Sequence, residues 1–175
     1  SDVYKRQVFA LYALNEESDL TRSIVADRVV PMGQLKSISD DYAVKIVDTV
    51  HKVDAGTMTG AEGSKNIQDA MSDIDKSWKD YTATYLTDEE KLNVAKFETL
   101  RQTADPKIKA ISALLTGGNR SEISDFANSE LYAVVDPLSN CISILTAIQL
   151  TAAKDGLRIG EELRLFILKT MTVLG

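Results

Sequence analysis

The chain has 175 residues, the size of one domain, and its 44% hydrophobic and 26% charged residues are typical of a folded protein. Its net charge of -6 and its lack of a basic cluster argue against nucleic-acid binding, because neutralising phosphates requires clustered Lys and Arg. One Cys and one His exclude an intrachain disulfide and a His/Cys zinc site, and we predict no cofactor.

The two ends of the sequence carry short apolar runs. Residues 1–7 resemble the in-frame translation of a sequencing-library adapter, and we exclude them from the predicted fold. The run that follows, residues 8–14, is shorter than the roughly 20 apolar residues that span a bilayer. A second run covers residues 165–175. We expect these runs to be the truncated end of one transmembrane helix and the truncated start of another, flanking a domain at 15–164.

The first helix is predicted near residues 14–54. Its apolar positions recur every three or four residues, which is a helical stripe and not strand alternation. The stripe consists of Leu35, Ile38, Tyr42, Ile46, Val50 and Val53. We expect the helix to end just before Gly56, which suits the left-handed position after a helix C-terminus.

Two capping boxes begin the middle helices. Thr59 and Glu62 predict the start of a second helix near 60–83, and Thr87 and Glu90 predict the start of a third near 87–116. The carboxylates of the second box are interpreted as helix capping, because acidic side chains favour the first turn of a helix. The third helix is expected to end at Gly117-Gly118.

The fourth helix is predicted as one element near 121–170, with an apolar stripe that starts at Leu131. Pro31, Pro106 and Pro137 fall inside or near the predicted helices, and we expect kinks or local breaks there because proline removes a backbone hydrogen bond. Pro106 has an alternative reading, in which Asp105 caps a new helix and splits the third one.

The helices are unequal in length. The middle pair has about 25 and 30 residues and the outer pair about 40 to 45, which at about 1.5 Å per residue is a difference of roughly 20 Å. The few turns, with 9 Gly and 3 Pro, also favour an all-α fold. We predict an antiparallel up-down-up-down four-helix bundle with long first and fourth helices leading to the truncated transmembrane segments.

Several segments resemble the four-helix-bundle ligand-binding (sensor) domains of methyl-accepting chemotaxis proteins, in residues 27–31, 34–36, 41–44, 47–53, 78–90 and 130–137. The resemblance covers nearly the whole chain from residue 8. It implies a homodimer in the inner membrane, with this domain in the periplasm, that binds a small-molecule ligand and catalyses no reaction. The resemblance also implies that ligand binding displaces the helices, and that this displacement passes across the membrane to a chemotaxis kinase and its coupling protein. Similar domains also occur on diguanylate cyclases and histidine kinases.

Ligands of this family bind towards the membrane-distal end, between subunits, with residues of the first and fourth helices. Counting equal distances from the membrane ends places Asp48 level with Tyr132, and Lys52 level with Asn128. The predicted ligand-binding residues are Lys45, Asp48, His51, Lys52, Asn128, Tyr132 and Asp136. Cationic groups at this level suit an organic acid, because charge-assisted hydrogen bonds are the stronger kind. The alternative is that Lys45 and Lys52 belong to a solvated face.

Two other function classes compete with a receptor. A structural bundle without a ligand has no polar residues facing the dimer axis. A ferritin-like enzyme needs Glu-x-x-His pairs on facing helices, which a single His51 does not supply. Cys141 lies in an apolar run and is predicted to be a buried, inert thiol instead of a catalytic partner of His51.

Overall fold

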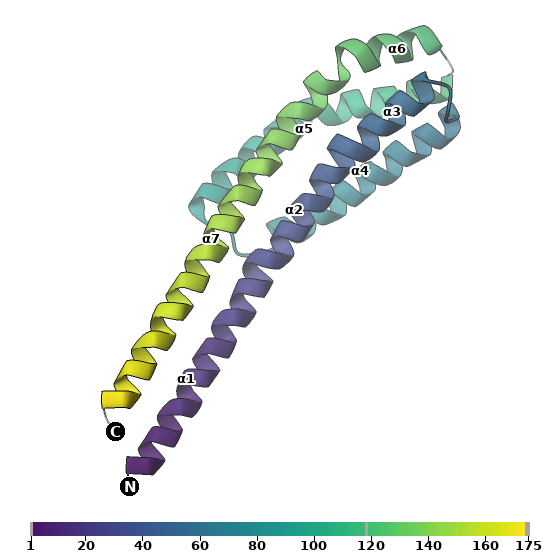
Figure 1. The fold of residues 1–175 in the computed structure, drawn as a ribbon. Coiled ribbons are helices and arrows are strands. Elements are labelled where there is room, and N and C mark those ends of the chain that lie inside the picture. Colours follow the sequence, from purple (N-terminus) through teal and green to yellow (C-terminus); the bar gives the residue numbers. More distant parts are fainter. Residues whose placement is uncertain (1, 118, 174–175) are drawn as a thin grey trace. The chain divides into compact units, whose positions relative to one another are not determined.

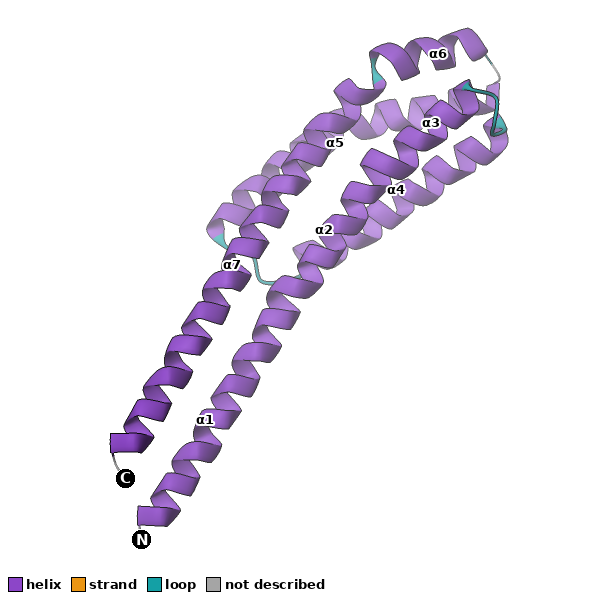
Figure 2. Cartoon of the chain, viewed as in Figure 1, coloured by secondary structure: helices purple, strands orange, loops and turns teal. Residues whose placement is uncertain are grey.

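The computed structural model describes residues 2–117 and 119–173, and this part of the chain contains helices and no strand (Figure 2). It divides into two compact units. Residues 33–148 form the first, here called the bundle unit. The described residues of 1–32 and 149–175 form the second, here called the paired-helix unit. The predicted all-α class is confirmed, while positions 1, 118 and 174–175 of the predicted segments lie outside the described residues.

The first helix runs without interruption to Asp54 through five consecutive elements: α1 (Asp2–Ile24), η1 (Val25–Val29), α2 (Val30–Asp40), η2 (Asp41–Ile46) and α3 (Val47–Asp54). Its predicted end is confirmed, with Gly56 in the left-handed region at φ 74°. α1 includes residues 2–7, which we had excluded from the fold on sequence grounds.

Pro31 does not break the first helix. The π-helical turn η1 immediately precedes it, and the Val30 N–H donates to the Val25 carbonyl, five residues back. Because proline has no N–H and its ring crowds the carbonyl four residues back, a wider turn at this place accommodates the ring. The expected local disturbance is therefore present as a π-turn.

Both predicted capping boxes are confirmed. At the start of α4 (Gly60–Thr82), the Glu62 N–H donates to Thr59 Oγ1 at 3.2 Å and the Thr59 N–H donates to Glu62 Oε2 at 3.0 Å. At the start of α5 (Asp88–Gly117), the Glu90 N–H donates to Thr87 Oγ1 at 3.3 Å and the Thr87 N–H donates to Glu90 Oε2 at 2.9 Å. These local bonds fix where the two middle helices begin.

The prediction of a single fourth helix is wrong. The structure has α6 (Arg120–Ser129) and α7 (Leu131–Val173), separated at Glu130, where φ widens to -114°. Asn128 and Ser129 donate side-chain hydrogen bonds to carbonyls within α6, which compete with the continuation of the helix. The breaks expected at Pro106 and Pro137 are absent, because α5 and α7 continue through both residues.

The core of the bundle unit is formed by one stripe from each helix. Trp78 of α4 packs against Phe97 of α5 with ring centroids 4.3 Å apart, and Tyr42 of η2 meets the edge of Phe97 at 6.3 Å. Figure 1 shows α3, α4 and α5 side by side in this unit. Fully buried aliphatic side chains complete the core: Leu35, Ile38, Ile46, Ile67, Ile74, Ile108, Ile111, Leu115, Leu131, Leu138, Ile142 and Leu145. Cys141 is buried among them, as predicted.

α4 and α5 approach each other closely at Gly60. A Cβ atom built on Gly60 would lie 1.8 Å from the carbonyl oxygen of Leu115. Only glycine fits there without moving one helix away from the other. The glycine therefore sets the spacing of the two middle helices.

The paired-helix unit contains α1 and the second part of α7. The Arg28 guanidinium of η1 donates to Gln149 Oε1 at 3.2 Å and so links the first helix to α7. Within the described residues, one helical stretch, Leu131–Lys169, is long and apolar enough to cross a membrane by length and composition. Part of that stretch is buried in the bundle core, where its apolar side chains pack against the other helices.

Candidate functional site

The predicted ligand-binding residues lie on η2, α3, α6 and the start of α7, all in the bundle unit. On α3, Lys52 Nζ lies 2.6 Å from Asp48 Oδ2, one helical turn away, and both side chains are about half exposed at 49% and 53%. Val47 and Val50 of the same helix are buried. Asp48 and Lys52 therefore form an exposed ion pair on the face of α3 that points away from the core.

Lys45 is directed elsewhere. Its Nζ lies 3.0 Å from Asp73 Oδ2 of α4 and 3.6 Å from Asp41 Oδ1, one turn back on its own helix. Asp41 is 8% exposed, and its other carboxylate oxygen has no hydrogen bond. Burial raises the pKa of the Asp41 carboxyl, and the charge of Lys45 opposes that rise. Lys45 thus joins the first helix to α4 and neutralises a buried acid.

His51 and Tyr132 are in direct contact. His51 Nε2 lies 3.2 Å from the Tyr132 hydroxyl, and the two rings are 6.0 Å apart at 37°. We had expected Tyr132 level with Asp48, and the structure places it by His51, about one turn farther along. The sequence count assumed a regular rise per residue, whereas the first helix contains the two π-turns η1 and η2.

Asn128 and Asp136 do not join this contact. Asn128 donates to the Ser124 carbonyl at 2.7 Å and to the Ser124 hydroxyl at 3.2 Å, so its amide is used within α6. Asp136, one turn after Tyr132 on α7, is exposed and forms no ion pair within the described part of the chain. The structure therefore brings together His51 and Tyr132, keeps Lys52 beside His51, and leaves Lys45 and Asn128 bound to other groups.

His51 and Tyr132, together with the neighbouring Asp48–Lys52 ion pair, are here called the distal site. It offers a phenol, an imidazole and an ion pair of both signs, on a surface where Tyr132 is 51% exposed. Within residues 2–117 and 119–173, no group of three or more His, Cys, Asp or Glu could hold a metal ion.

Two cavities of the bundle unit are lined by residues other than those of the distal site. One of about 410 Å³ is bounded by α4 and α5, with Gln68, Asp75 and Lys109 at its walls, and one of about 240 Å³ is bounded by α5 and α7 near Pro137. The distal site is an open surface in the single chain, whereas small-molecule sites bury most of their ligand. A ligand there needs a second surface to enclose it.

Sequence reasoning missed Asp41 and Asp73 as partners of Lys45. Asp73 belongs to α4, and the pairing depends on how α4 packs against η2, which no local pattern reveals. A signal for Asp41 did exist. It lies in an Asp40-Asp41 pair, one position before the core residue Tyr42, where a carboxylate is placed at the edge of the buried stripe.

Comparison with known proteins gives a consistent result. Residues 8–156 match the family described as the four helix bundle sensory module for signal transduction. The chain is 39% identical over 132 residues to the methyl-accepting chemotaxis protein NahY of Pseudomonas putida, a match that covers 75% of this chain and 24% of that protein. The chain thus corresponds to about a quarter of the length of this relative. No solved structure matches the chain significantly.

Proposed function

Because the chain belongs to the family of four-helix-bundle sensory modules for signal transduction, we propose that it is the periplasmic sensor domain of a chemoreceptor in the inner membrane. In this proposal the distal site binds a small organic acid between the subunits of a homodimer. The domain changes the relative position of its helices and catalyses no reaction. The family match and the name of the relative support the role in chemotaxis.

One observation carries the proposal for the site. The contact between His51 and Tyr132 joins α3 to α7. α3 is the end of the first helix, which contains the terminal run 8–14, and α7 contains the terminal run 165–173. A ligand that replaces this hydrogen bond changes the contact between the first and fourth helices. It shifts their arrangement only by its differential affinity for the two states, and slides of about 1–2 Å are usual in such transitions.

An organic acid can be accommodated by exchange at Lys52. In the single chain Lys52 is paired with Asp48 in an exposed ion pair, and such pairs contribute only about 0–1 kcal/mol. The acid replaces the Asp48 carboxylate, and hydrogen bonds from Tyr132 and His51 add to the pairing. The second subunit encloses the ligand and removes water, which strengthens these bonds.

The displaced helices lead, in this proposal, through the membrane to a cytoplasmic module that binds the chemotaxis kinase and its coupling protein. The same sensor domain on a diguanylate cyclase or a histidine kinase would use the same site and differ only in the module beyond it. A structural bundle without a ligand is the remaining alternative. A structural bundle of this kind gives no reason for an exposed polar surface at Tyr132.

The proposal is tested by thermal unfolding of the chain against a panel of aliphatic and aromatic carboxylic acids and amino acids, including succinate and benzoate. A bound acid at a hundredfold its dissociation constant adds about 2.7 kcal/mol to the free energy of unfolding. Stabilisation by one class of acid supports the proposal. No stabilisation by any compound in the panel favours the structural bundle.

A further inference from the structure

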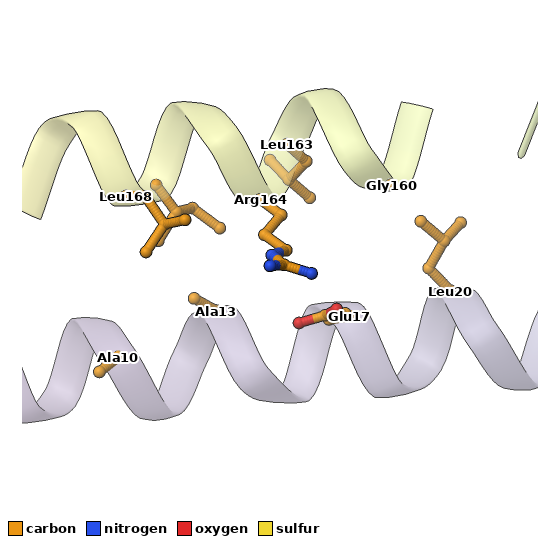
Figure 3. A pocket seen from close by; sticks show the side chains of 9 residues that line it. Ala10, Ala13, Glu17, Leu20, Gly160, Leu163, Arg164 and Leu168 are labelled. Atoms are coloured by element: carbon orange, nitrogen blue, oxygen red, sulfur yellow. The ribbon is translucent and has the colours of Figure 1, made fainter. Parts of the chain in front are cut away.

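The paired-helix unit contains a pocket of about 300 Å³ between α1 and the second part of α7 (Figure 3). Gly160 of α7 faces the Leu20 side chain of α1, and a Cβ atom on Gly160 would lie 2.8 Å from Leu20 Cδ2. Beside this contact, Ala10 and Ala13 present short side chains and leave space unfilled. Leu163, Ile167 and Leu168 form the opposite, apolar wall.

Two charged residues lie at the same pocket, one on each helix. Figure 3 shows the Arg164 side chain extending from α7 towards α1, where Glu17 lies. Both side chains are exposed, and within the described residues neither forms an ion pair with the other or with a third group. By contrast, Arg158 on the same helix is paired with Glu162 at 2.8 Å. The pocket thus combines an apolar wall with one cation and one anion that are both available to a ligand.

This combination selects a class of ligand. A fatty acid would satisfy Arg164 and leave its own charge near Glu17, whereas an uncharged hydrocarbon would leave both charges beside apolar surface without a partner. A zwitterion satisfies both, because a guanidinium binds phosphate oxygens and a carboxylate binds an ammonium group. The apolar wall then takes a hydrocarbon chain.

The surroundings of the pocket indicate where such a molecule comes from. Next to it, α7 exposes Leu165 and Phe166, and α1 exposes Leu11 and Tyr12. Exposed apolar and aromatic side chains of this kind are typical of a membrane interface. We propose that the pocket binds a zwitterionic phospholipid of the surrounding bilayer, with its phosphate at Arg164, its ammonium at Glu17 and the start of an acyl chain against Ala13 and Ile167. This inference rests on the proposed function in one respect, that the terminal helices enter a membrane.

The test is isothermal titration calorimetry of the 175-residue chain with dihexanoylphosphatidylethanolamine below its micelle concentration. Arg164→Gln is expected to weaken binding about tenfold or more, since a hydrogen bond to a charged group is lost. Arg158→Gln removes the same charge from the same helix outside the pocket and is expected to leave the affinity unchanged. Ala13→Leu fills the space and is expected to abolish binding, with the helical circular dichroism signal retained.

Headgroup preference tests the role of Glu17. The wild-type chain should bind the ethanolamine lipid more tightly than dihexanoylphosphatidylglycerol, which has no ammonium group, and Glu17→Gln should remove that preference. Equal affinities for Arg164→Gln and Arg158→Gln would overturn the proposal, as would hexanoate binding as tightly as the phospholipid.

A second copy of the chain is the competing occupant. If Ala13→Leu changes the monomer–dimer equilibrium in sedimentation and leaves phospholipid affinity unchanged, the pocket is an interface between copies and the proposal fails. Failure here is distinguishable from failure of the proposed function, because the organic-acid test reports on residues of the bundle unit. None of those residues is changed in these variants.

Discussion

The Nε2 atom of His51 lies 3.2 Å from the hydroxyl oxygen of Tyr132, and this contact joins the first helix to the fourth at the distal site. Tyr132→Phe removes the hydroxyl and keeps the ring. Because the pair is partly solvated, we expect a loss of no more than about 1 kcal/mol in the free energy of unfolding, together with weaker binding of an acid ligand. Urea unfolding and calorimetry measure the two effects. A loss of several kcal/mol would identify the contact as a structural link and not a binding group.

The buried carboxylate of Asp41 predicts a pH-dependent stability. Its pKa is raised by burial, so the folded state binds the proton more tightly than the unfolded state does. The free energy of unfolding therefore falls as the pH rises from the ordinary Asp range through the raised pKa. Asp41→Asn removes the charge while Asp73 still pairs with Lys45, and we expect it to stabilise the protein at pH 7 by on the order of 1 kcal/mol.

The same difference should disappear at a pH below the ordinary Asp pKa, where the Asp41 carboxyl of the wild type is protonated in both the folded and the unfolded state. Urea unfolding at pH 7 and at acidic pH measures it. Asp69→Asn is the matched control, because Asp69 forms an exposed i,i+4 ion pair with Lys65 at 2.5 Å on α4. A destabilised Asp41→Asn variant at pH 7 would show that the ionised carboxylate contributes favourably.

Gly60 predicts a steric effect between the middle helices. In Gly60→Ala the new methyl group overlaps the Leu115 carbonyl, so α4 must move away from α5, and we expect a loss of about 3 kcal/mol or more. Gly33→Ala is the control. Nothing lies within 4 Å of its added Cβ atom, and α2 should gain up to about 1 kcal/mol from the better helix former. Thermal unfolding compares the two, and similar losses in both variants would contradict the close approach.

An ion-pair network at the edge of the bundle core predicts a destabilising effect of substitution at Arg101. Its guanidinium pairs with Asp75 of α4 and, at 2.9 Å, with Asp105, which accepts a hydrogen bond from Tyr42. Arg101→Ala leaves the Asp105 carboxylate, which is 19% exposed, without its cation, whereas Asp75 is 65% exposed and is solvated by water. We expect a loss of about 2 kcal/mol, the order of a hydrogen bond to a charged group. Lys109→Ala, an exposed change on the same helix, should cost under about 0.5 kcal/mol. Equal effects of the two substitutions would show that the network contributes little.

The sequence was sufficient wherever structure depends on neighbours along the chain. Thr59 and Glu62 are three residues apart, and their reciprocal hydrogen bonds depend on nothing beyond the first turn of α4, so the start of that helix could be predicted. The left-handed Gly56 was predictable for the same reason. The core stripe of the first helix followed from helical periodicity alone, since Leu35, Ile38, Tyr42, Ile46 and Val50 are all buried. In α5, by contrast, the apolar Leu92 is 74% exposed.

The predictions that failed concern contacts between helices or small differences in helix geometry. The break at Glu130 results from side chains of α6 that bond to their own backbone, while Pro137, the stronger local signal, lies inside α7. Tyr132 contacts His51 and not Asp48, the residue that the count placed level with it. That count assumed a regular rise per residue and did not include the π-turns. Lys45 was assigned to the distal site because its pairing with Asp73 depends on the packing of α4.

The most direct test of the proposed sensor function is the affinity of the acid ligand for Lys52→Glu. Lys36→Glu is the matched control, since Lys36 forms an exposed ion pair with Asp40 at 2.7 Å on the first helix, 16 residues before Lys52. Calorimetry with the carboxylic acid that stabilises the wild-type chain should show no binding to Lys52→Glu and unchanged binding to Lys36→Glu. Both variants should melt within about 0.5 kcal/mol of the wild type. Wild-type affinity in Lys52→Glu would contradict the account and place the ligand elsewhere.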